Sequence, residues 1–185
     1  MVDFIMRRSG PDYDCNILIE GDIPQAARIT LQDCDLHVVR EELEYMEAEQ
    51  GMSTTFRIYD LSLDEEPGRF DKRLKKAGGE SLGSISILWF SGGNEMKINH
   101  LKIDNSVRGE GLGSVLMMIA FGLGELAQIR DIGFWIGGGG ETVDWLVKKG
   151  VPRSLIDTTS TGNVSTTMRF REIDYDRDRI TVRRD

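Results

Sequence analysis

The chain has 185 residues, with 23 lysines and arginines against 31 aspartates and glutamates, which gives a formal charge of −8. This length favours one domain with its own core, and a composition of 39% hydrophobic and 29% charged residues excludes disorder throughout. The acidic balance argues against a general nucleic-acid binder, because binding to phosphates needs a basic surface. The sequence contains no apolar run of about 18 residues, so we expect no membrane span.

Three local features bear on location and partners. Cys15 and Cys34 are too few for a disulfide scaffold and lack CxxC spacing, so we expect reduced thiols. The first residues hold no apolar segment long enough for secretion, and the expected location is the cytoplasm. Seven carboxylates lie between Asp33 and Gln50. They form either a solvated helix face or an acidic patch that favours a cationic partner.

The first 80 residues are expected to form short strands and one helix. Strands are expected at residues 15–20, 27–32 and 54–63. Apolar residues at spacings of three and four predict an amphipathic helix over 35–50, with Asp35 as its N-cap and Gly51 as its stop. A charged linker follows at 64–80, with a short basic helix at 70–76.

The remaining residues predict hairpins mixed with strand–helix–strand units. Strands are expected at residues 81–90, 95–103, 131–136 and 164–173, and helices at residues 114–129 and 142–149. The first helix is apolar nearly all round and is expected in the core, while residues 137–140 are read as a flexible loop. This order of elements predicts an α/β or α+β layered structure.

The strand at 95–103 contains a slip in its apolar pattern. Met96 and Ile98 are in phase with each other, and so are Leu101 and Ile103, but the two pairs are out of phase by one residue. Side chains alternate strictly along a strand, so the slip predicts an extra residue near Asn99. Such a β-bulge frees backbone N–H groups, and bulges are frequent beside active sites.

A glycine-rich segment joins this strand to the next helix. It consists of Arg108, Gly109, Glu110, Gly111, Leu112, Gly113 and Ser114. Glycines allow tight turns and close approach of the backbone to a ligand, and the first amides of a helix are a ready anion site. Arg108 adds a charge-assisted contact, so a phosphate or pyrophosphate is expected here. The spacing excludes a mononucleotide P-loop and differs from the dinucleotide fingerprint.

The run Leu101-x-Ile103-x-x-x-x-Arg108-Gly109-x-Gly111-Leu112-Gly113-Ser114-x-Leu116 resembles the coenzyme A motif of the GNAT acetyltransferase superfamily. In that family the loop amides hold the pyrophosphate of acetyl-CoA. The resemblance therefore implies acetyl-CoA contacts at Leu101, Ile103, Arg108, Gly109, Glu110, Gly111, Leu112, Gly113 and Ser114. It extends over roughly residues 81–173, and Asn105 stands where the family often has proline.

The resemblance also implies an architecture. We expect a GNAT-like mixed, mostly antiparallel sheet with a splayed, bulged strand and flanking helices. Residues 81–173 would be the acetyl-CoA-binding core, 1–80 an atypical N-terminal part of the same domain, and 174–185 a charged C-terminal tail. In the family the pantetheine arm lies in the gap beside the bulged strand. A freed amide, here that of Leu101, polarises the thioester carbonyl. Members of the family also often form homodimers through a C-terminal strand, which here would be 164–173.

Proton transfer is harder to assign from sequence. The reaction needs a base for the ammonium of the acceptor and an acid for the leaving thiolate. Candidate bases are His100, which titrates near neutrality, and Glu95, with Asp104, Glu141 and Asp144 as further carboxylates. Leu146 stands where the family often has its acidic tyrosine, and Val151 where it often has phenylalanine. Water is an alternative for either proton transfer.

The sequence thus predicts an N-acetyltransferase that moves acetyl from acetyl-CoA to an amine by direct attack, without a metal. The acceptor is expected to be a protein N-terminus, a lysine or a small cationic amine. Two alternatives stay open. One is a non-catalytic GNAT-fold module for binding or structure, and the other is a different α/β protein whose loop holds a nucleotide. Binding of CoA separates the last from the first two, and turnover separates the enzyme from the module.

Overall fold

The computed structural model describes residues 4–5, 16–34, 36–41, 44–47, 50–60, 81–90, 92, 94–137, 139–160, 163–170, 173–174 and 180–183. The expected linker at 64–80, its short helix at 70–76 and Asp35 lie outside these residues. No helix within the described ranges is long and apolar enough to cross a membrane.

The largest sheet has the strand order β10-β11-β9-β8-β7-β6-β4, and β5 also pairs with β6. Its strands are β4 (Leu36–Arg40), β5 (Glu44–Met46), β6 (Gly51–Asp60), β7 (Gly83–Phe90), β8 (Glu95–Ile103), β9 (Asp131–Ile136), β10 (Asp157–Thr158) and β11 (Val164–Arg169). The β8–β9 pair is parallel, and the other pairs of this sheet are antiparallel. The expected mixed, mostly antiparallel sheet is confirmed.

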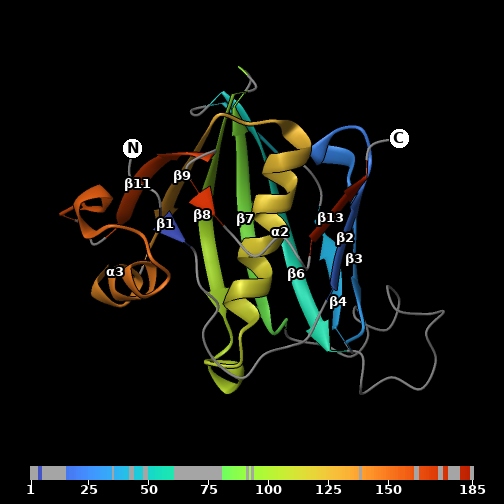
Figure 1. The fold of residues 1–185 in the computed structure, drawn as a ribbon, viewed down its shortest axis with the longest axis horizontal. Coiled ribbons are helices and arrows are strands. Elements are labelled where there is room, and N and C mark those ends of the chain that lie inside the picture. The colour runs from blue at the N-terminus through green and yellow to red at the C-terminus, as the bar shows by residue number, and fades with distance from the viewer. Residues whose placement is uncertain are drawn as a thin grey trace.

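Two smaller sheets bring the ends of the chain onto the main body. β2 (Asn16–Glu20) pairs with β3 (Arg28–Gln32) on one side and, in parallel, with β13 (Ile180–Arg183) on the other. β1 (Phe4–Ile5) pairs in parallel with β12 (Ile173–Asp174). The charged segment at 174–185 therefore contains a strand that pairs with the N-terminal part of the chain (Figure 1).

Two α-helices complete the described elements. α2 (Leu112–Ala127) agrees with the expected helix at 114–129, and α3 (Gly139–Lys148) begins three residues before the expected helix at 142–149. The loop expected at 137–140 is correspondingly shorter. Single 3₁₀ turns are formed by η1 (Pro24–Ala26), η3 (Asn105–Val107) and η4 (Arg153–Leu155).

The helix expected over residues 35–50 is wrong, because these residues form β4 and β5 instead. Leu36 and Val38 are buried while His37 between them is exposed, so the period is that of a strand. Leu36 fits a helical spacing with Val39 and a strand spacing with Val38. The β-branched pair at Val38 and Val39 favours the strand. Pairing of β4 with β6 then satisfies the backbone groups that a helix would have paired internally. Gly51, expected to stop the helix, begins β6.

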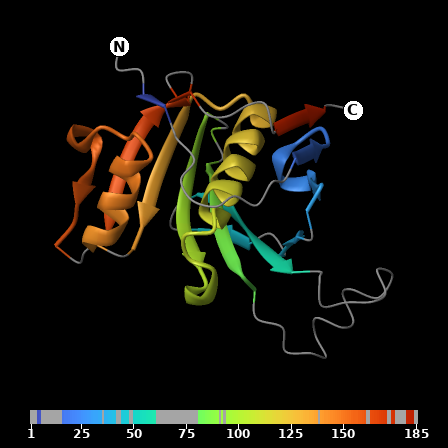
Figure 2. The same cartoon turned by 60° about the horizontal axis from the view of Figure 1, so that its bottom comes forward.

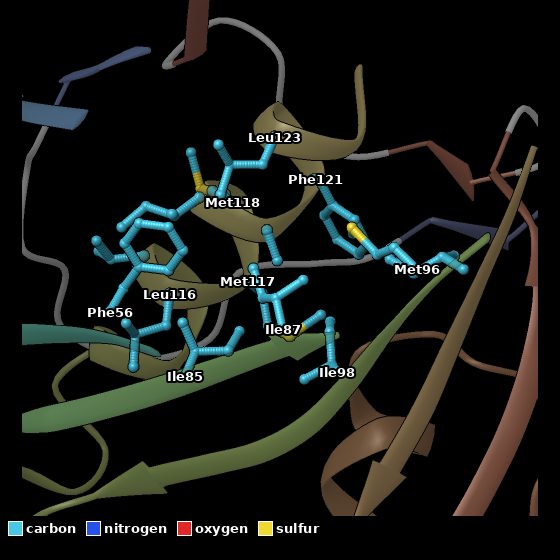
Figure 3. Packing of buried hydrophobic residues seen from close by; sticks show 14 of the residues in the cluster. Phe56, Ile85, Ile87, Met96, Ile98, Leu116, Met117, Met118, Phe121 and Leu123 are labelled. Atoms are coloured by element: carbon cyan, nitrogen blue, oxygen red, sulfur yellow. The ribbon is translucent and has the colours of Figure 1, made fainter. Parts of the chain in front are cut away.

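The main core lies between α2 and the large sheet. Figure 3 shows apolar side chains of β7 and β8, such as Ile87 and Ile98, pointing at Leu116, Met117 and neighbouring residues of α2. α2 also contacts β2 and β13 of the three-stranded sheet, so it is enclosed from two sides (Figure 1). A helix that is apolar all round is stable in water only when it is enclosed in this way.

One expectation about the cysteines is wrong. Cys34, which follows β3, is disulfide-bonded in the structure rather than a reduced thiol. The number and spacing of cysteines alone do not predict a single disulfide bond. Among the described residues, no group of three or more histidines, cysteines and carboxylates gathers as a metal site would require.

Candidate functional site

The site begins at a β-bulge in β8. His100 pairs with Ser86 of β7, and Ile98 pairs with the next residue, Ile87, so Asn99 is an extra residue with no partner in the β7 register. The bulge predicted from the phase slip is therefore confirmed. It lets Met96 and Ile98 before it, and Leu101 and Ile103 after it, all turn toward the side of the sheet where α2 lies.

β8 separates from β9 at the same place. The two strands pair only along residues 95–98 of β8 and 131–134 of β9. Trp135 and Ile136 then continue in register with β11 alone, while β8 continues with β7 alone. Figure 2 shows the two strands diverging from their paired ends. The expected splayed strand is confirmed, and one edge of β8 is left facing the gap.

Hydrogen bonding identifies which amides face this gap. The N–H of Asp104 donates to Leu82 O at 2.9 Å, on the β7 side. Backbone groups of successive strand residues point alternately to the two sides, so the N–H of Lys102 also points to β7. The N–H groups of Leu101 and Ile103 therefore point away from β7, toward the gap. This is the orientation that the Leu101 amide would need for its expected role, which is to polarise the thioester carbonyl.

The segment after β8 is shaped by a capping carboxylate and two glycines. Asp104 caps η3 by accepting a hydrogen bond from the N–H of Ser106 at 2.9 Å and another from its hydroxyl. These two bonds hold the pKa of the Asp104 carboxyl below its usual value. Gly109 and Gly111 have φ angles of +89° and +93°, which other residues adopt only with strain. Gly111 is the N-cap of α2, so the turn directs the first amides of the helix at the loop.

A cavity of about 330 Å³ connects these parts. Its lining includes Leu101 and Ile103 beside the gap, the glycine loop, and the first turn of α2. All the residues expected to contact the cofactor line it, except Glu110. The apolar side chains of β8 lie at one end, and the positive end of the α2 dipole lies at the other. The cavity thus combines an apolar wall with an anion site.

The opposite wall comes from α3, and sequence reasoning missed its role. Trp145, Lys148 and Lys149 line the cavity together with Glu141 and Thr142. Lys149 is only 3% exposed, and its Nζ donates a hydrogen bond to Ser114 Oγ in the first turn of α2. The available sequence signal was an adjacent lysine pair at the end of an amphipathic helix. It did not distinguish the buried lysine from the exposed one.

The two principal base candidates lie outside this cavity. Glu95 is at the start of β8, where its carboxylate pairs with Lys97 at 3.6 Å. His100 is exposed and lies beside the bulge, on the face of β8 opposite to Leu101. Partial burial, with the charges of Lys102 and Arg57, lowers the pKa of His100, so its imidazole is neutral at pH 7. Their catalytic roles stay predictions.

Other candidates for proton transfer divide between the cavity and its surroundings. Glu141 lines the cavity, while Asp144 is exposed on α3 and does not. Leu146, at the position where the resemblance placed a tyrosine, is fully buried in the core. No tyrosine of the described residues lines this cavity. Glu141 is thus the carboxylate that the structure brings to the cavity.

A second cavity of about 400 Å³ lies on the other face of β8. Its lining includes Arg57, Tyr59, Ser84, Lys102 and Asp104. The charges there are balanced, because Arg57 Nε lies 2.6 Å from Glu41 Oε1 and Lys102 shares the lining with Asp104. This bond to Glu41 also raises the pKa of Arg57 above its usual value. Hydrogen-bonded pairing of β7 with β8 separates this cavity from the first.

The comparisons with known proteins concern the architecture. No family model and no curated protein matches the chain. Among solved structures, nourseothricin acetyltransferase is similar over 78% of this chain and 72% of its own, with 14% identity and a TM-score of 0.45. The mixed sheet, the bulge in β8 and its separation from β9 are the features that the resemblance to the GNAT superfamily predicts.

Two further solved structures have similar folds. The IAA acetyltransferase from Bacillus cereus ATCC 14579 aligns over 72% of this chain and 99% of its own, with 11% identity and a TM-score of 0.44. A GNAT family acetyltransferase from Elizabethkingia anophelis, with acetyl-CoA bound, aligns over 73% and 98%, with 8% identity and a TM-score of 0.45. At these identities the similarity assigns neither a family nor an activity.

Proposed function

We propose that the chain is an acyltransferase that takes the acetyl group of acetyl-CoA and passes it to an amine. The observation that carries the proposal is the single cavity that runs from the open edge of β8 to the first turn of α2. The cofactor has an extended, largely apolar arm that ends in phosphates. This order matches the cavity, which has apolar side chains of β8 at one end and the N-terminus of α2 at the other. The helix N-terminus suits the pyrophosphate, and the strand edge suits an arm that carries amide groups.

In the proposed reaction, acetyl-CoA supplies an acetyl group activated as a thioester. The N–H of Leu101 faces the gap, and it would donate a hydrogen bond to the carbonyl oxygen as negative charge develops there. The amine nitrogen forms a bond to the carbonyl carbon, and the carbon–sulfur bond breaks. A base removes the proton of the amine, and the thiol leaves protonated. His100, Glu95 and Glu141 are the candidates for the base, with water as an alternative.

The acceptor is proposed as a cationic amine, either a protein N-terminus, a lysine or a small molecule. The net charge of −8 supports this class, because a negative surface attracts cations. The proposal includes no metal.

One observation favours a second candidate, a GNAT-fold module that binds CoA without turnover. Leu146 is buried at the position of the expected acid, and His100 and Glu95 lie outside the cavity. The two candidates predict the same cofactor binding but differ in turnover.

The test is a titration of the purified protein with acetyl-CoA by calorimetry, followed by an assay of thiol release in the presence of amines. The enzyme proposal predicts binding, and amine-dependent release of CoA. Binding without release for N-terminal peptides, lysine peptides and polyamines would favour the module. No binding at millimolar acetyl-CoA would remove both candidates, and competition with ATP and NAD would then test a nucleotide ligand.

A further inference from the structure

The second cavity, of about 400 Å³, lies on the face of the sheet that α2 does not cover. α2 packs on one face of β7 and β8, against side chains that include Ile85 and Leu101 (Figure 1). Side chains alternate along a strand, so Ser84 and Lys102, which line the second cavity, point to the opposite face. Hydrogen-bonded pairing of β7 with β8 separates this cavity from the one proposed for acetyl-CoA.

Three polar residues form a row across the floor of this cavity. Arg57 of β6 pairs with Ser84 of β7, and Ser84 pairs with Lys102 of β8. Neighbouring strands are about 4.8 Å apart, so Ser84 lies between two cations whose side chains are longer than this spacing. A group bound over Ser84 is therefore within reach of both cations.

Ser84 is the buried member of the row. It is 4% exposed, and none of the described residues forms a hydrogen bond with its hydroxyl. A buried hydroxyl without a partner is destabilising, and this one opens into the cavity. Ser86, the next serine on the same face, has its hydroxyl 2.7 Å from Thr55 Oγ1. The fold thus provides a partner for one serine and leaves the other to donate to a ligand.

The two cations supply the other donors. Arg57 bonds Glu41 through Nε alone, at 2.6 Å, which leaves its two Nη groups for a ligand. Within the part of the chain that the structure describes, the Lys102 ammonium has no hydrogen-bond or ion-pair partner. Burial first, and then the charges of Lys102 and Arg57, lower the pKa of His100, so both cations act on one place. An anionic group over Ser84 would meet three kinds of donor.

Asp104 supplies the opposite charge at the end of the cavity. It follows Lys102 by two residues on the same face, about 7 Å along the chain. Ser106 bonds only its Oδ1, so Oδ2 is left for a ligand. The charges around the cavity sum to zero, with Arg57 and Lys102 against Glu41 and Asp104. A dianion such as phosphate would upset this balance, whereas a ligand with one carboxylate and one ammonium keeps it.

We propose that the second cavity binds a free α-amino acid. Its carboxylate would lie over Ser84, between Lys102 and Arg57, and its ammonium would face Asp104. Diagonal neighbours on two strands, such as Ser84 and Asp104, are about 7–8 Å apart, a span that an amino acid and two short side chains fill. The volume of about 400 Å³ is at the small end of ligand sites and leaves room for a side chain. The inference goes beyond the proposed function, because acetyl-CoA has no part in it.

The first test is thermal unfolding of the purified protein with each standard L-amino acid at about 10 mM, because a ligand of the folded state raises the unfolding temperature. We expect at least one amino acid to raise it. The amide of that amino acid lacks the carboxylate, and its N-acetyl derivative lacks the ammonium, so neither should have the effect. If no amino acid stabilises the protein, or if the amide is as effective, the inference is wrong. The result does not depend on acetyl-CoA binding, so it stands apart from the proposed function.

The second test places the ligand by calorimetry with the most effective amino acid. Ser84→Ala removes the hydroxyl and Lys102→Met removes a cation, and each should weaken binding about tenfold or more. Asp104→Asn keeps an acceptor for Ser106 and removes the charge, so it should weaken binding of the amino acid but not of its N-acetyl derivative. Lys97→Met is the matched control, a lysine of β8 outside the cavity, and should stay within about twofold of wild type.

Folding of the variants is checked by their unfolding temperatures without ligand. Lys102 is exposed, so Lys102→Met is expected to fold even if a change at the buried Ser84 disturbs the sheet. An amino acid that binds Lys102→Met and Asp104→Asn as tightly as wild type would lie elsewhere on the protein, and this would overturn the inference. Weakening by Lys97→Met as large as by Lys102→Met would also overturn it, because the effect would then follow net charge rather than the cavity.

Discussion

Two glycines of the cavity have different physical roles. Gly111 caps α2 with a φ of +93°, so a side chain there is strained wherever its atoms go. Gly113 lies within α2, and an added Cβ would meet Trp145 Cζ2 at 3.8 Å and Ile103 Cγ1 at 3.9 Å, which are ordinary contacts. The fold therefore requires glycine at position 111, whereas at position 113 the missing side chain leaves room in the cavity.

This difference predicts opposite effects of two alanine substitutions. Gly111→Ala should lower the free energy of unfolding by about 1 kcal/mol or more, because of the left-handed backbone. Gly113→Ala should raise it by up to about 1 kcal/mol, because alanine is the better helix former. It should also weaken acetyl-CoA binding about tenfold by filling the cavity. Urea unfolding and calorimetry measure both quantities, and a Gly113→Ala protein with full affinity would contradict the proposed ligand position.

His100 predicts a pH dependence of stability. Its pKa in the folded protein is lowered by burial and by Lys102 and Arg57, so it lies below the unfolded value near 6.5. Between these two values the unfolded chain binds more protons, and stability therefore rises with pH through this window. On acidification, the part of the stability that depends on His100 staying neutral is lost below about pH 6.5.

The measurement is thermal unfolding between pH 7.5 and pH 5 for wild type and two variants, a range chosen to span the usual histidine pKa of about 6.5. His100→Gln should lose less stability than wild type on acidification. His37→Gln, which removes the histidine exposed on β4, is the control for removing a histidine as such. An unchanged acid loss in His100→Gln would show that other groups are responsible.

At the scale of the element, the bulge makes a sharp prediction. Deleting Asn99 would place His100 directly after Ile98, opposite Ser86, and every later side chain would keep its present face. The variant should therefore fold with the same core. The extra residue that opens the edge of β8 would be gone, and thiol release should fall by about 10² or more, as for loss of an oxyanion donor.

Asn99→Ala is the matched control for this deletion, because it keeps the bulge and removes only the side chain. Its rate is expected to stay close to that of wild type. Circular dichroism and thermal unfolding establish that both variants are folded. A deletion variant with normal rate would remove the Leu101 amide from the proposed mechanism.

The elements also mark where sequence patterns were sufficient. The bulge was predictable because a change of phase in a strand has a single geometric meaning, and α2 was predictable from its long apolar run. The strands within residues 35–50 were not predictable, because Leu36 is spaced for a helix with Val39 and for a strand with Val38. Only the pairing of β4 with β6 decides between the two. Eight of the nine cofactor residues expected from the motif line one cavity, because they are nearly contiguous in sequence. Lys149 lies 35 residues after Ser114, and only the fold brings them together.

At the scale of the whole molecule, α2 is held between the large sheet and the three-stranded sheet of β13, β2 and β3. The large sheet covers one side, and β2 with β13 covers another. Ile17 and Ile19 of β2 are almost completely buried in the common core. The last strand of the chain therefore helps to enclose the helix whose first turn forms the anion site. The stability of the site depends on residues near both ends of the chain.

Removal of residues 179–185 tests this dependence. The truncated chain loses β13, which uncovers the edge of β2 and part of α2. We expect the free energy of unfolding to fall by at least about 2 kcal/mol, the value of one large apolar side chain exposed to water. The exposed strand edge should also promote aggregation. Removing only residues 184–185 is the control, and equal urea midpoints for the two truncations would contradict the structural role of β13.

The pairing of β2 with β13 has a consequence for synthesis in the cell. A ribosome makes β2 and β3 long before it makes the partner of β2, which lies at residues 180–183. Until then the edge of β2 stays open, and α2 lacks part of its cover. The fold therefore closes only after residues 180–183 have been made, and until then the partly made chain has the exposed apolar surface that chaperones bind.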